Sequence, residues 1–349
     1  MLALQAMTPR QLVAAVPAIH EAEARKIIAM VHRGEPVSAS ASVRRTSAEA
    51  VRAVSHVPAL IVTAEAASEI DPFVKYVCES AGERFETVRI PLEHAGRYSV
   101  CVSSQVGCAL ACAFCATGRM GLRRNLAAWE IVEQVRVVRA RLASGRVHGV
   151  VFQGMGEPMA NLDNVLAAIE VMTDPCALAI DARAITVCTS GLPSGIRRLA
   201  AEQPNVRLGL SMSSAIEPHR KRVMPIADRH ALDDVIEACA FHARTTGLSP
   251  MWAVTLLAGI NDSDDDARAL ADRVVAFTAA TGRRPRISII AYNSIAERSD
   301  APGTIDPFTR SPREAAFRAV LSAAGLPSHR RYSGGSDVAA ACGQLANTV

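Results

Sequence analysis

The chain has 349 residues and a formal net charge of +4, and 50% of it is apolar but only 4% aromatic. This is the composition of a globular protein with an ample core, and its uncharged apolar runs fall short of the roughly 18 residues that a membrane span needs. A charged run, Glu21–Arg25, stands where a signal peptide would be cleaved, so we expect no secretion signal and no membrane partner. The nine cysteines then indicate a reducing cytoplasm, where thiols serve metals or catalysis.

Residues 1–52 are expected to form a small helical accessory domain. Leu12, Val16 and Ile19 fall at helical spacing, and residues 22–31 continue as a second helical segment. This piece is either a solvated helical face or an RNA-contacting domain, because clustered basic side chains neutralise phosphates. Residues 35–47, rich in Ser and Ala, look like a linker. The basic residues of the piece are Arg10, Arg25, Lys26, Arg33, Arg44 and Arg45.

Residues 53–96 are expected to form a small β extension. Three runs, 59–63, 73–77 and 85–91, are rich in β-branched and aromatic residues and are separated by turn residues. A further short strand, 98–102, leads the chain into a loop that holds three cysteines.

From residue 97 to the end, strand and helix patterns alternate. Six βα units in a row favour a parallel sheet covered by helices, and no Gly-x-Gly-x-x-Gly follows the first strand to support a dinucleotide fold. We therefore predict an α/β fold in which residues 97–349 form a partial (β/α)6 barrel with its active site at the C-terminal strand ends. Further strands are expected at 149–152, 185–188, 206–211, 251–257 and 286–292, and helices at 125–142, 162–172, 195–202, 231–244, 264–281 and 311–324.

The three cysteines Cys108, Cys112 and Cys115 have the spacing C-x3-C-x2-C. A fully protein-ligated [4Fe–4S] cluster needs four cysteines, so three would leave one iron open to a small molecule. A structural zinc site needs a fourth ligand, and no His or Cys follows until His148. A disulfide needs an oxidising compartment. The spacing favours a cluster that passes one electron into bound S-adenosylmethionine (SAM).

Polar residues and glycines follow several of the predicted strands, at 153–158, 189–191, 211–214 and 292–294. Each segment alone is typical of a cap or a turn. Glu157 is more informative, because a carboxylate there can accept from the ammonium of an amino-acid-like ligand while the neighbouring glycines permit close approach. Together with the cysteine loop, these segments predict one ligand site at the mouth of the barrel.

These motifs resemble the RlmN/Cfr family of radical SAM RNA methyltransferases from about residue 8 to the end of the chain. The segments that carry the resemblance are Cys101–Cys108, the cysteine loop, Met155–Pro158 and Asp337–Ala346. The resemblance implies a [4Fe–4S] cluster on Cys108, Cys112 and Cys115. It also implies a SAM site lined by Gly156, Glu157, Ser190, Ser211, Met212, Ser213 and Asn293. With it we expect ribosomal or transfer RNA as substrate, an electron donor such as flavodoxin or ferredoxin, and a monomeric enzyme.

The resemblance further implies roles for Cys342, Cys101 and Glu86. Cys342 would carry a methyl group, which becomes a methylene radical and adds to carbon 2 or carbon 8 of an adenine. Glu86 would accept the proton, and the Cys101 thiolate would release the product and leave a Cys101–Cys342 disulfide. From composition alone, there is an alternative: the two cysteines would be small buried apolar residues, and Glu86 would be a solvated strand residue. The cysteines without a motif are expected to pack in the core: Cys78, Cys176, Cys188 and Cys239.

Three segments depart from the family pattern: Ser211–Ser214, where most members carry Ser-Leu-His-Ala, Ser333–Asp337 and Ser294–Asp300. We therefore expect a divergent member with an altered RNA target. A radical enzyme acting on a small molecule or peptide is the alternative, and an iron–sulfur RNA-binding protein without activity is a third hypothesis. The residues considered for RNA contact are Arg119, Arg123, Arg124, His219–Arg222, Arg283, Arg284, Arg330 and Arg331.

Overall fold

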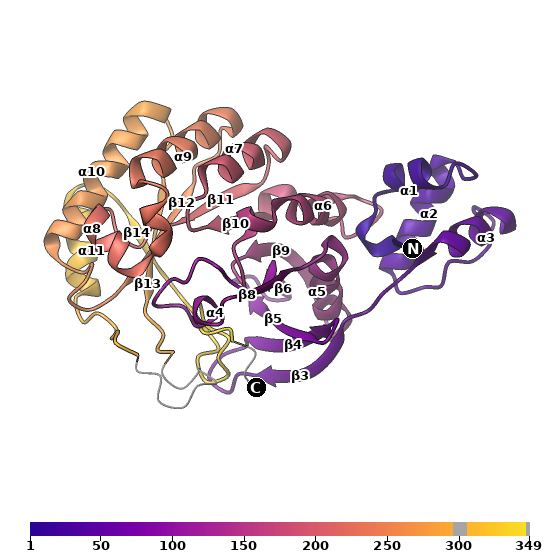
Figure 1. Ribbon diagram of the computed structural model, residues 1–349, viewed down its shortest axis with the longest axis horizontal. Helices are drawn as coiled ribbons and strands as arrows, with labels where there is room; N and C mark the ends of the chain where they lie inside the picture. Colours follow the sequence, from indigo (N-terminus) through magenta and orange to yellow (C-terminus); the bar gives the residue numbers. More distant parts are fainter. Residues whose placement is uncertain (296–305, 347–349) are drawn as a thin grey trace.

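The computed structural model describes residues 1–295 and 306–346, so the altered segment 294–300 lies largely outside the described residues. A ten-stranded sheet dominates the fold (Figure 1). In spatial order its strands are β14 (Ser328–Arg331), β13 (Arg286–Ala291), β12 (Met251–Leu256), β11 (Arg207–Ser211), β10 (Ile185–Thr189), β9 (Arg146–Phe152), β6 (Arg97–Val102), β5 (Glu83–Pro91), β4 (Val74–Ser80) and β3 (Ile61–Ala67).

The parallel part of the sheet runs from β6 to β14, and among the described residues it remains open, as expected for a partial barrel. Its helices follow the strands in the predicted alternation. They are α5 (Ala128–Ala140), α6 (Leu162–Thr173), α7 (Pro193–Glu202), α8 (Glu217–Val223), α9 (Leu232–Thr246), α10 (Asp264–Thr281) and α11 (Glu314–Ala323). The strand β14 was not predicted; it pairs with β13 from Ile287 to Ile290 and extends the barrel by a seventh parallel strand.

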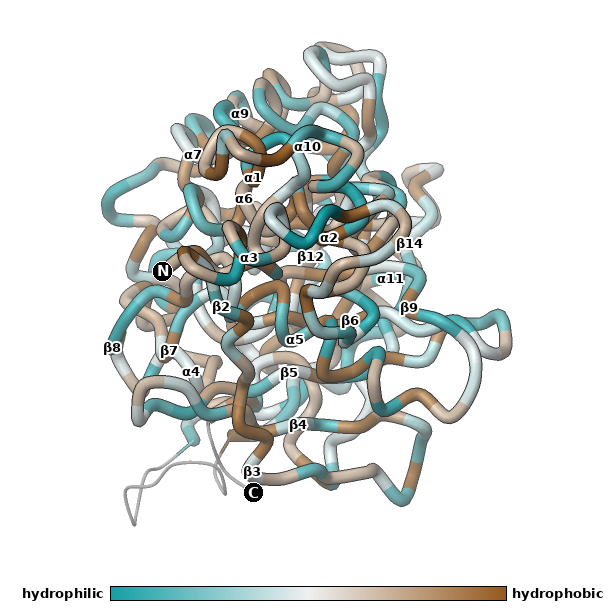
Figure 2. The backbone as a smooth tube through the Cα atoms, turned by 90° about the vertical axis from the view of Figure 1, so that its right-hand side faces the viewer, coloured by the Kyte–Doolittle hydropathy of each residue, from teal (hydrophilic) through white to brown (hydrophobic). Residues whose placement is uncertain are grey.

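The core lies between this sheet and its helices. Parallel strands covered by helices are buried on both faces. Most side chains of β10 to β13 are accordingly buried. Figure 2 colours the backbone by hydropathy and shows hydrophilic segments mainly on the outer helices and loops. Trp252 of β12 and Phe277 of α10 are both buried and meet edge to face, with ring centroids 5.0 Å apart. Burying such a side chain contributes about 1.5–3 kcal/mol to folding.

The β extension continues the same sheet. β3, β4 and β5 are antiparallel to one another, and β5 pairs with β6 through Val88 and Cys101. The hydrophobic pattern predicted these strands but not their partner, because a strand's own sequence does not name the edge it joins. As a consequence the extension lies directly beside the first barrel strand, which delivers the chain into the cysteine loop.

The N-terminal residues form a helical lobe at the far right of Figure 1, containing α1 (Pro9–Ala15), α2 (Glu21–His32) and α3 (Arg45–Val54). Short strands β1 (Leu2–Ala3) and β2 (Ser55–His56) pair in parallel beneath it. Buried Glu23 accepts hydrogen bonds from the guanidinium and backbone N–H of Arg44, and these lower the pKa of its carboxyl well below the usual range. This pair anchors the end of the segment predicted as a linker.

One predicted helix start is wrong. Asn125 does not cap a helix; its side chain accepts a hydrogen bond from Gln105 Nε2 at 2.8 Å, and α5 begins three residues later. There the Glu130 carboxylate accepts from the backbone N–H of Ala127 and supports the first turn. None of the helices in the described residues is both long enough and apolar enough to span a membrane.

Candidate active site

The cysteine loop leaves the sheet through β7 (Gln105–Gly107), which pairs with β8 (Leu122–Asn125). Gly107 has φ +73°, and a Cβ on it would lie 1.8 Å from the carbonyl oxygen of Gly121, so only glycine fits this close crossing. The N–H of Cys108 donates to that same oxygen at 2.9 Å. The loop is therefore closed tightly at its base, and it contains α4 (Ala116–Arg119), which begins directly after Cys115.

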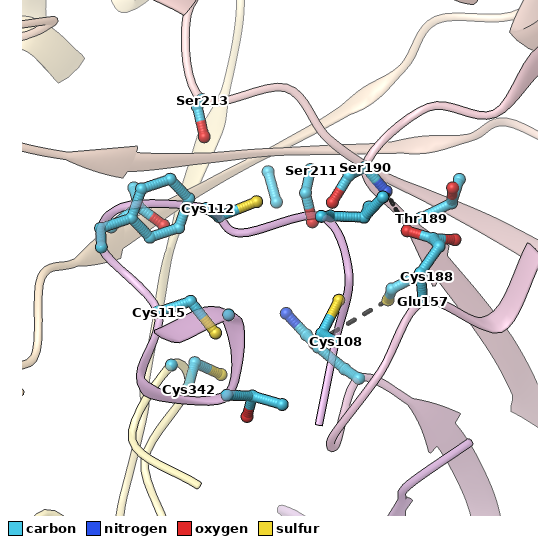
Figure 3. Close-up of a pocket in the computed structure, with 18 of the residues that line it drawn as sticks. Cys108, Cys112, Cys115, Glu157, Cys188, Thr189, Ser190, Ser211, Ser213 and Cys342 are labelled. Carbon is cyan, nitrogen blue, oxygen red and sulfur yellow. Dashed lines mark hydrogen bonds between the residues drawn. The ribbon is translucent and has the colours of Figure 1, made fainter. Parts of the chain in front are cut away.

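The thiols of Cys108, Cys112 and Cys115 point into one cavity at the C-terminal strand ends (Figure 3). In the described residues no three His, Cys, Asp or Glu side chains are close enough to hold a single metal ion. The three cysteines nevertheless line one cavity, and cysteine thiolates are the ligands of a [4Fe–4S] cluster. Burial raises the pKa of all three, that of Cys108 to about 12. A cationic group is therefore needed to hold them as thiolates.

We call this space the cluster cavity; it is open to solvent and measures about 950 Å³ outside the atoms, open solvent included. The residues Gly156, Glu157, Ser190, Ser211 and Ser213, predicted to line a SAM site, all border it. The Glu157 carboxylate accepts from the N–H groups of Met159 (3.0 Å) and Ser190 (2.9 Å), which joins the ends of β9 and β10. Burial raises the pKa of Glu157, and these hydrogen bonds only partly offset the effect.

Two further residues predicted for the SAM site, Met212 and Asn293, do not line the cluster cavity. Met212 is fully buried in the core and is not among the residues that line the cluster cavity. Asn293 contacts the C-terminal segment instead: its Nδ2 donates to the carbonyl oxygen of Cys342 at 3.1 Å and to Ser333 Oγ at 3.2 Å. Sequence position alone did not separate an inward-facing side chain from one that holds a neighbouring loop.

The altered segment Ser211–Ser214 is anchored by a hydrogen bond from Asn261. Asn261 Nδ2 donates to the carbonyl oxygen of Ser213 at 2.6 Å, and Ser213 has φ +59°, an unusual conformation for a residue with a side chain. Ser213 therefore turns toward the cluster cavity at the position where most family members carry His.

The C-terminal segment brings Cys342 to the cluster. Cys342 borders the cluster cavity, and its thiol lies beside Cys115 in Figure 3. The N–H of Cys342 donates to Ser333 Oγ at 2.8 Å. The next residues are bound to α4, since the N–H of Ala116 donates to the Gly343 carbonyl oxygen at 2.8 Å and Thr117 Oγ1 donates to that of Leu345 at 2.6 Å.

A second set of contacts clamps the tail to the turn between β3 and β4. Asp71 Oδ2 accepts from the Tyr332 hydroxyl and from the N–H of Gly335, both at 2.8 Å. Asp337 in turn accepts from Ser68 Oγ at 2.7 Å and from the N–H of Glu69 at 2.8 Å. Burial works to raise the pKa of each aspartate, but these hydrogen bonds outweigh it and lower both. No sequence pattern indicates this clamp, because its halves are more than 260 residues apart.

Cys101 and Cys342 both border a second cavity, which we call the thiol cavity. It measures about 660 Å³ outside the atoms, open solvent included. It shares one wall with the cluster cavity, formed by Cys115, Thr117, Gln153, Gly154, Cys342 and Gly343. Burial raises the pKa of the Cys101 thiol to about 12, while the charge of Arg331 acts in the opposite direction. Cys342 therefore stands between two chambers, with the cluster loop on one side and Cys101 on the other.

Arg331 also borders the thiol cavity, and its Nη1 is buried without a hydrogen-bond partner in the part of the chain that the structure describes. Leaving a buried donor unpaired costs about 1–3 kcal/mol. Arg331 Nη1 therefore offers a hydrogen-bond donor to a ligand bound in the thiol cavity.

Cys188 was predicted to be a core residue, but it lines the cluster cavity. Its thiol lies 3.8 Å from Gln153 Oε1, and burial raises its pKa to about 12. The only signal in the sequence was its place on a strand immediately before the polar segment 189–191, which applies equally to many core residues.

Glu86 is fully buried, with Lys75 Nζ 2.9 Å from its Oε1. It was expected to be solvated if it had no catalytic role, and the structure excludes that alternative. Val88, two residues further along β5, pairs with both Lys75 and Cys101, so all four side chains share one face of the sheet. Glu86 itself borders neither cavity.

Most residues considered for RNA contact are engaged within the protein. Arg330 pairs with Glu314, and Arg220 is buried with its Nη2 donating to the Ser190 carbonyl oxygen at 2.7 Å. Arg123, Arg124 and Lys221 form ion pairs with Glu83, Glu130 and Asp228, and Arg119 Nη2 donates to the Ala113 carbonyl oxygen. Arg283 and Arg284 remain exposed.

An open parallel α/β barrel with a three-cysteine loop at its mouth defines a radical SAM enzyme. The family model for the radical SAM superfamily matches residues 102–274. A solved radical SAM methyltransferase from Sphaerobacter thermophilus is 32% identical and superposes with a TM-score of 0.85 over 100% of both chains. Enzymes of this superfamily use a [4Fe–4S] cluster and SAM, and the cluster cavity has the ligand set for them.

Relatives found by sequence show to which group of radical SAM enzymes the chain belongs. A probable RNA methyltransferase of Sorangium cellulosum is 55% identical over 97% of this chain and 91% of its own length. A dual-specificity RNA methyltransferase RlmN of Desulfotalea psychrophila is 39% identical over 76% of this chain and 72% of its own. The chain belongs to the radical SAM RNA methyltransferases, the family of RlmN. The expected fold and family are thereby confirmed.

Proposed function

We propose that this protein methylates a ring carbon of an adenine in RNA, with Cys342 as the carrier of the methyl group and Cys101 as the thiol that releases the product. The observation that carries the proposal is the position of Cys342, which borders both the cluster cavity and the thiol cavity. A methyl carrier must meet SAM on one side and the substrate base on the other.

The cluster cavity is proposed to hold the cluster and SAM, and the thiol cavity is proposed to bind the substrate base. When bound, the cluster and SAM supply a methyl group to the Cys342 sulfur and, in a second round, the radical that takes a hydrogen atom from it. The clamp and the α4 contacts hold Cys342 at the shared wall during both rounds. The thiol cavity receives the base, whose apolar faces suit its walls of Phe73, Val88, Ile90 and Leu345. Arg331 Nη1 can donate to a ring nitrogen.

Before release, the methylene carbon on Cys342 would bond to the ring carbon, the unpaired electron left on the ring would pass to the oxidised cluster, and the ring carbon would lose a proton. Release of the product is assigned to Cys101. Its thiolate attacks the Cys342 sulfur, an S–S bond forms and the bond between that sulfur and the methylene carbon breaks. The electron pair of the broken bond remains on the carbon, which takes a proton to become the methyl group. Glu86, on the same sheet face as Cys101, is proposed to accept the proton that leaves the ring carbon.

A base in folded RNA must leave its stack to reach an enclosed cavity, so we propose unpaired bases of ribosomal or transfer RNA as targets. The electron donor proposed is flavodoxin or ferredoxin, and the enzyme is proposed to act as a cytoplasmic monomer. These assignments follow the family, whose members include the dual-specificity enzymes described above.

The test is nucleoside mass spectrometry of RNA incubated anaerobically with the reconstituted enzyme, SAM and reductant. We expect 2-methyladenosine or 8-methyladenosine, and peptide analysis should show methylated Cys342. Methyl transfer to a ribose hydroxyl or an exocyclic amine, or an unmodified Cys342 after turnover, would refute the proposal.

A further inference from the structure

The N-terminal ends of the barrel strands carry a row of arginines, at the opposite end of the sheet from the cysteine loop. Arg97, Arg146, Arg207 and Arg286 are the first residues of β6, β9, β11 and β13. Arg183 lies in the short helical turn η3 (Ala182–Ala184) immediately before β10. Five of six adjacent strands therefore begin at or just after an arginine. In parallel strands these ends lie along one edge.

Four arginines of this end line a continuous hollow, which we call the arginine groove. Arg139, from the last turn of α5, and Arg146 line its first part, and Arg183 and Arg207 line its second part. His148 and Asp181 border both parts. Asp181 is the single carboxylate that lines the groove, and it already accepts a hydrogen bond from the N–H of Arg183 at 2.9 Å. The groove is strongly positive.

The arginines of the groove lack internal partners. Within residues 1–295 and 306–346, neither these four nor Arg97 and Arg286 form an ion pair or a side-chain hydrogen bond. Arginines on the outer helices differ: Arg198, Arg244 and Arg268 lie 2.5 to 2.6 Å from the carboxylates of Asp163, Glu237 and Asp265.

Like charges are also placed against each other at this end. Arg97 and Arg146 are direct partners in the β6–β9 register. The Arg286 residue is exposed to solvent, but partial desolvation and the charge of Arg207 still lower its pKa. Like charges directly opposite each other in a sheet destabilise it. An arrangement that costs folding free energy in the free protein indicates an anionic ligand that offsets the repulsion when bound.

We propose that the arginine groove is a second RNA-binding surface, which holds the phosphate backbone of the RNA whose target base enters the thiol cavity. This inference rests on the proposed function. Phosphate is favoured over protein carboxylates as the ligand because guanidinium groups bind it bidentately and a row over six strands, about 4.8 Å apart, can follow several consecutive phosphates of one backbone.

The geometry also limits the substrate. The parallel strands from β6 to β13 have five to seven residues, so the two ends of the sheet are roughly 20 Å apart at about 3.3 Å per residue. An RNA that contacts the groove while a base enters the mouth must extend around the side of the barrel. A folded RNA with several helices can do so, whereas an isolated stem-loop occupies the mouth alone.

The experiment compares two triple variants with the same loss of charge. Arg146→Gln, Arg183→Gln and Arg207→Gln remove the groove; Arg198→Gln, Arg244→Gln and Arg268→Gln are the matched control on the outer helices. Affinity for labelled bulk transfer RNA and for a short stem-loop is measured by anisotropy across a KCl series, with the iron-loaded full-length protein. Circular dichroism melting checks folding, and the groove variant is expected to melt no lower than wild type because like-charge repulsion is relieved.

For transfer RNA, we expect the slope of log affinity against log salt to fall by about 2–3 in the groove variant, since each lost phosphate contact removes roughly 0.7–0.9. Between about 50 and 200 mM salt, wild type should then lose roughly 20–40 times more affinity than the groove variant. The control variant should retain the wild-type slope, and all three proteins should bind the stem-loop equally.

An unchanged slope in the groove variant, or an equal fall in the control, would overturn this inference. A groove-dependent affinity for poly-glutamate with unaltered RNA binding would also overturn it and indicate an acidic protein partner. The proposed function fails in a different way: RNA would bind through the groove with the expected salt slope, but no methyladenosine would form in it.

Discussion

The cluster cavity and the thiol cavity share a wall but are built differently. The three proposed cluster ligands of the cluster cavity come from one loop of eight residues, and Glu157, Ser190 and Ser213 follow consecutive parallel strands. The thiol cavity is assembled from β5, β6, β14 and the C-terminal segment. A site whose parts are close in sequence depends on a local turn, while a site assembled across the chain depends on whatever holds its distant pieces together.

The largest effect is expected in the cluster cavity. Replacing any one of Cys108, Cys112 and Cys115 with Ala removes one of three ligands, and a cluster with two protein ligands is not retained. Iron should fall from about four per chain to near zero, and SAM cleavage should stop. Iron analysis and detection of 5′-deoxyadenosine are the measurements. A triple variant that keeps its iron would contradict the assignment of this loop.

Cys101→Ala affects only the thiol cavity. Iron content, SAM cleavage and Cys342 methylation should persist, because Cys101 does not border the cluster cavity. Release should be blocked, so that a covalent protein–RNA adduct accumulates as a shifted band under reducing, denaturing conditions and disappears with ribonuclease. Full turnover, or loss of activity without an adduct, would show that Cys101 has only a structural role.

The features that the sequence predicts are those built from residues close together in the chain, as in the cluster cavity. The cysteine loop, the glycines before Glu157 and the alternation of strands and helices are local patterns, and the structure contains them where they were expected. The pairing of β5 with β6, the Asp71 clamp and the contact of Asn293 with Cys342 join segments far apart in the chain. Periodicity and motif spacing carry no information about such pairs, so none of these three contacts was predicted.

A smaller effect is expected from Asp71→Ala. The change removes the acceptor for Tyr332 and Gly335 of the tail and for the N–H of Phe73 in the turn, so three hydrogen bonds of about 1 kcal/mol each are lost, two of them to the tail. The tail should leave the shared wall more often, and Cys342 methylation should slow by roughly tenfold, which corresponds to about 1.4 kcal/mol. Iron content should not change, because the cluster loop does not touch Asp71.

Two measurements distinguish positioning from general destabilisation. Amide hydrogen exchange should increase at residues 332–346 but not in β9 to β13. The control is Asp174→Ala, which removes a similar turn contact to the N–H of Cys176 at the end of α6 and should leave Cys342 methylation unaltered. Equal slowing by both variants would mean that the clamp has no special role.

The smallest effect is expected from Cys188→Ser. The thiol of Cys188 interacts with the charge of Arg331, as do the thiols of Cys101 and Cys342. It lines the cluster cavity, however, and not the thiol cavity where the proposed Cys342–adenine bond would be cleaved. Serine can still donate to Gln153 Oε1 in place of the thiol. Steady-state formation of methyladenosine should therefore stay within about twofold of wild type, since one neutral hydrogen bond contributes only about 1 kcal/mol. A block with accumulation of the protein–RNA adduct would mean that Cys188, rather than Cys101, attacks the Cys342 sulfur.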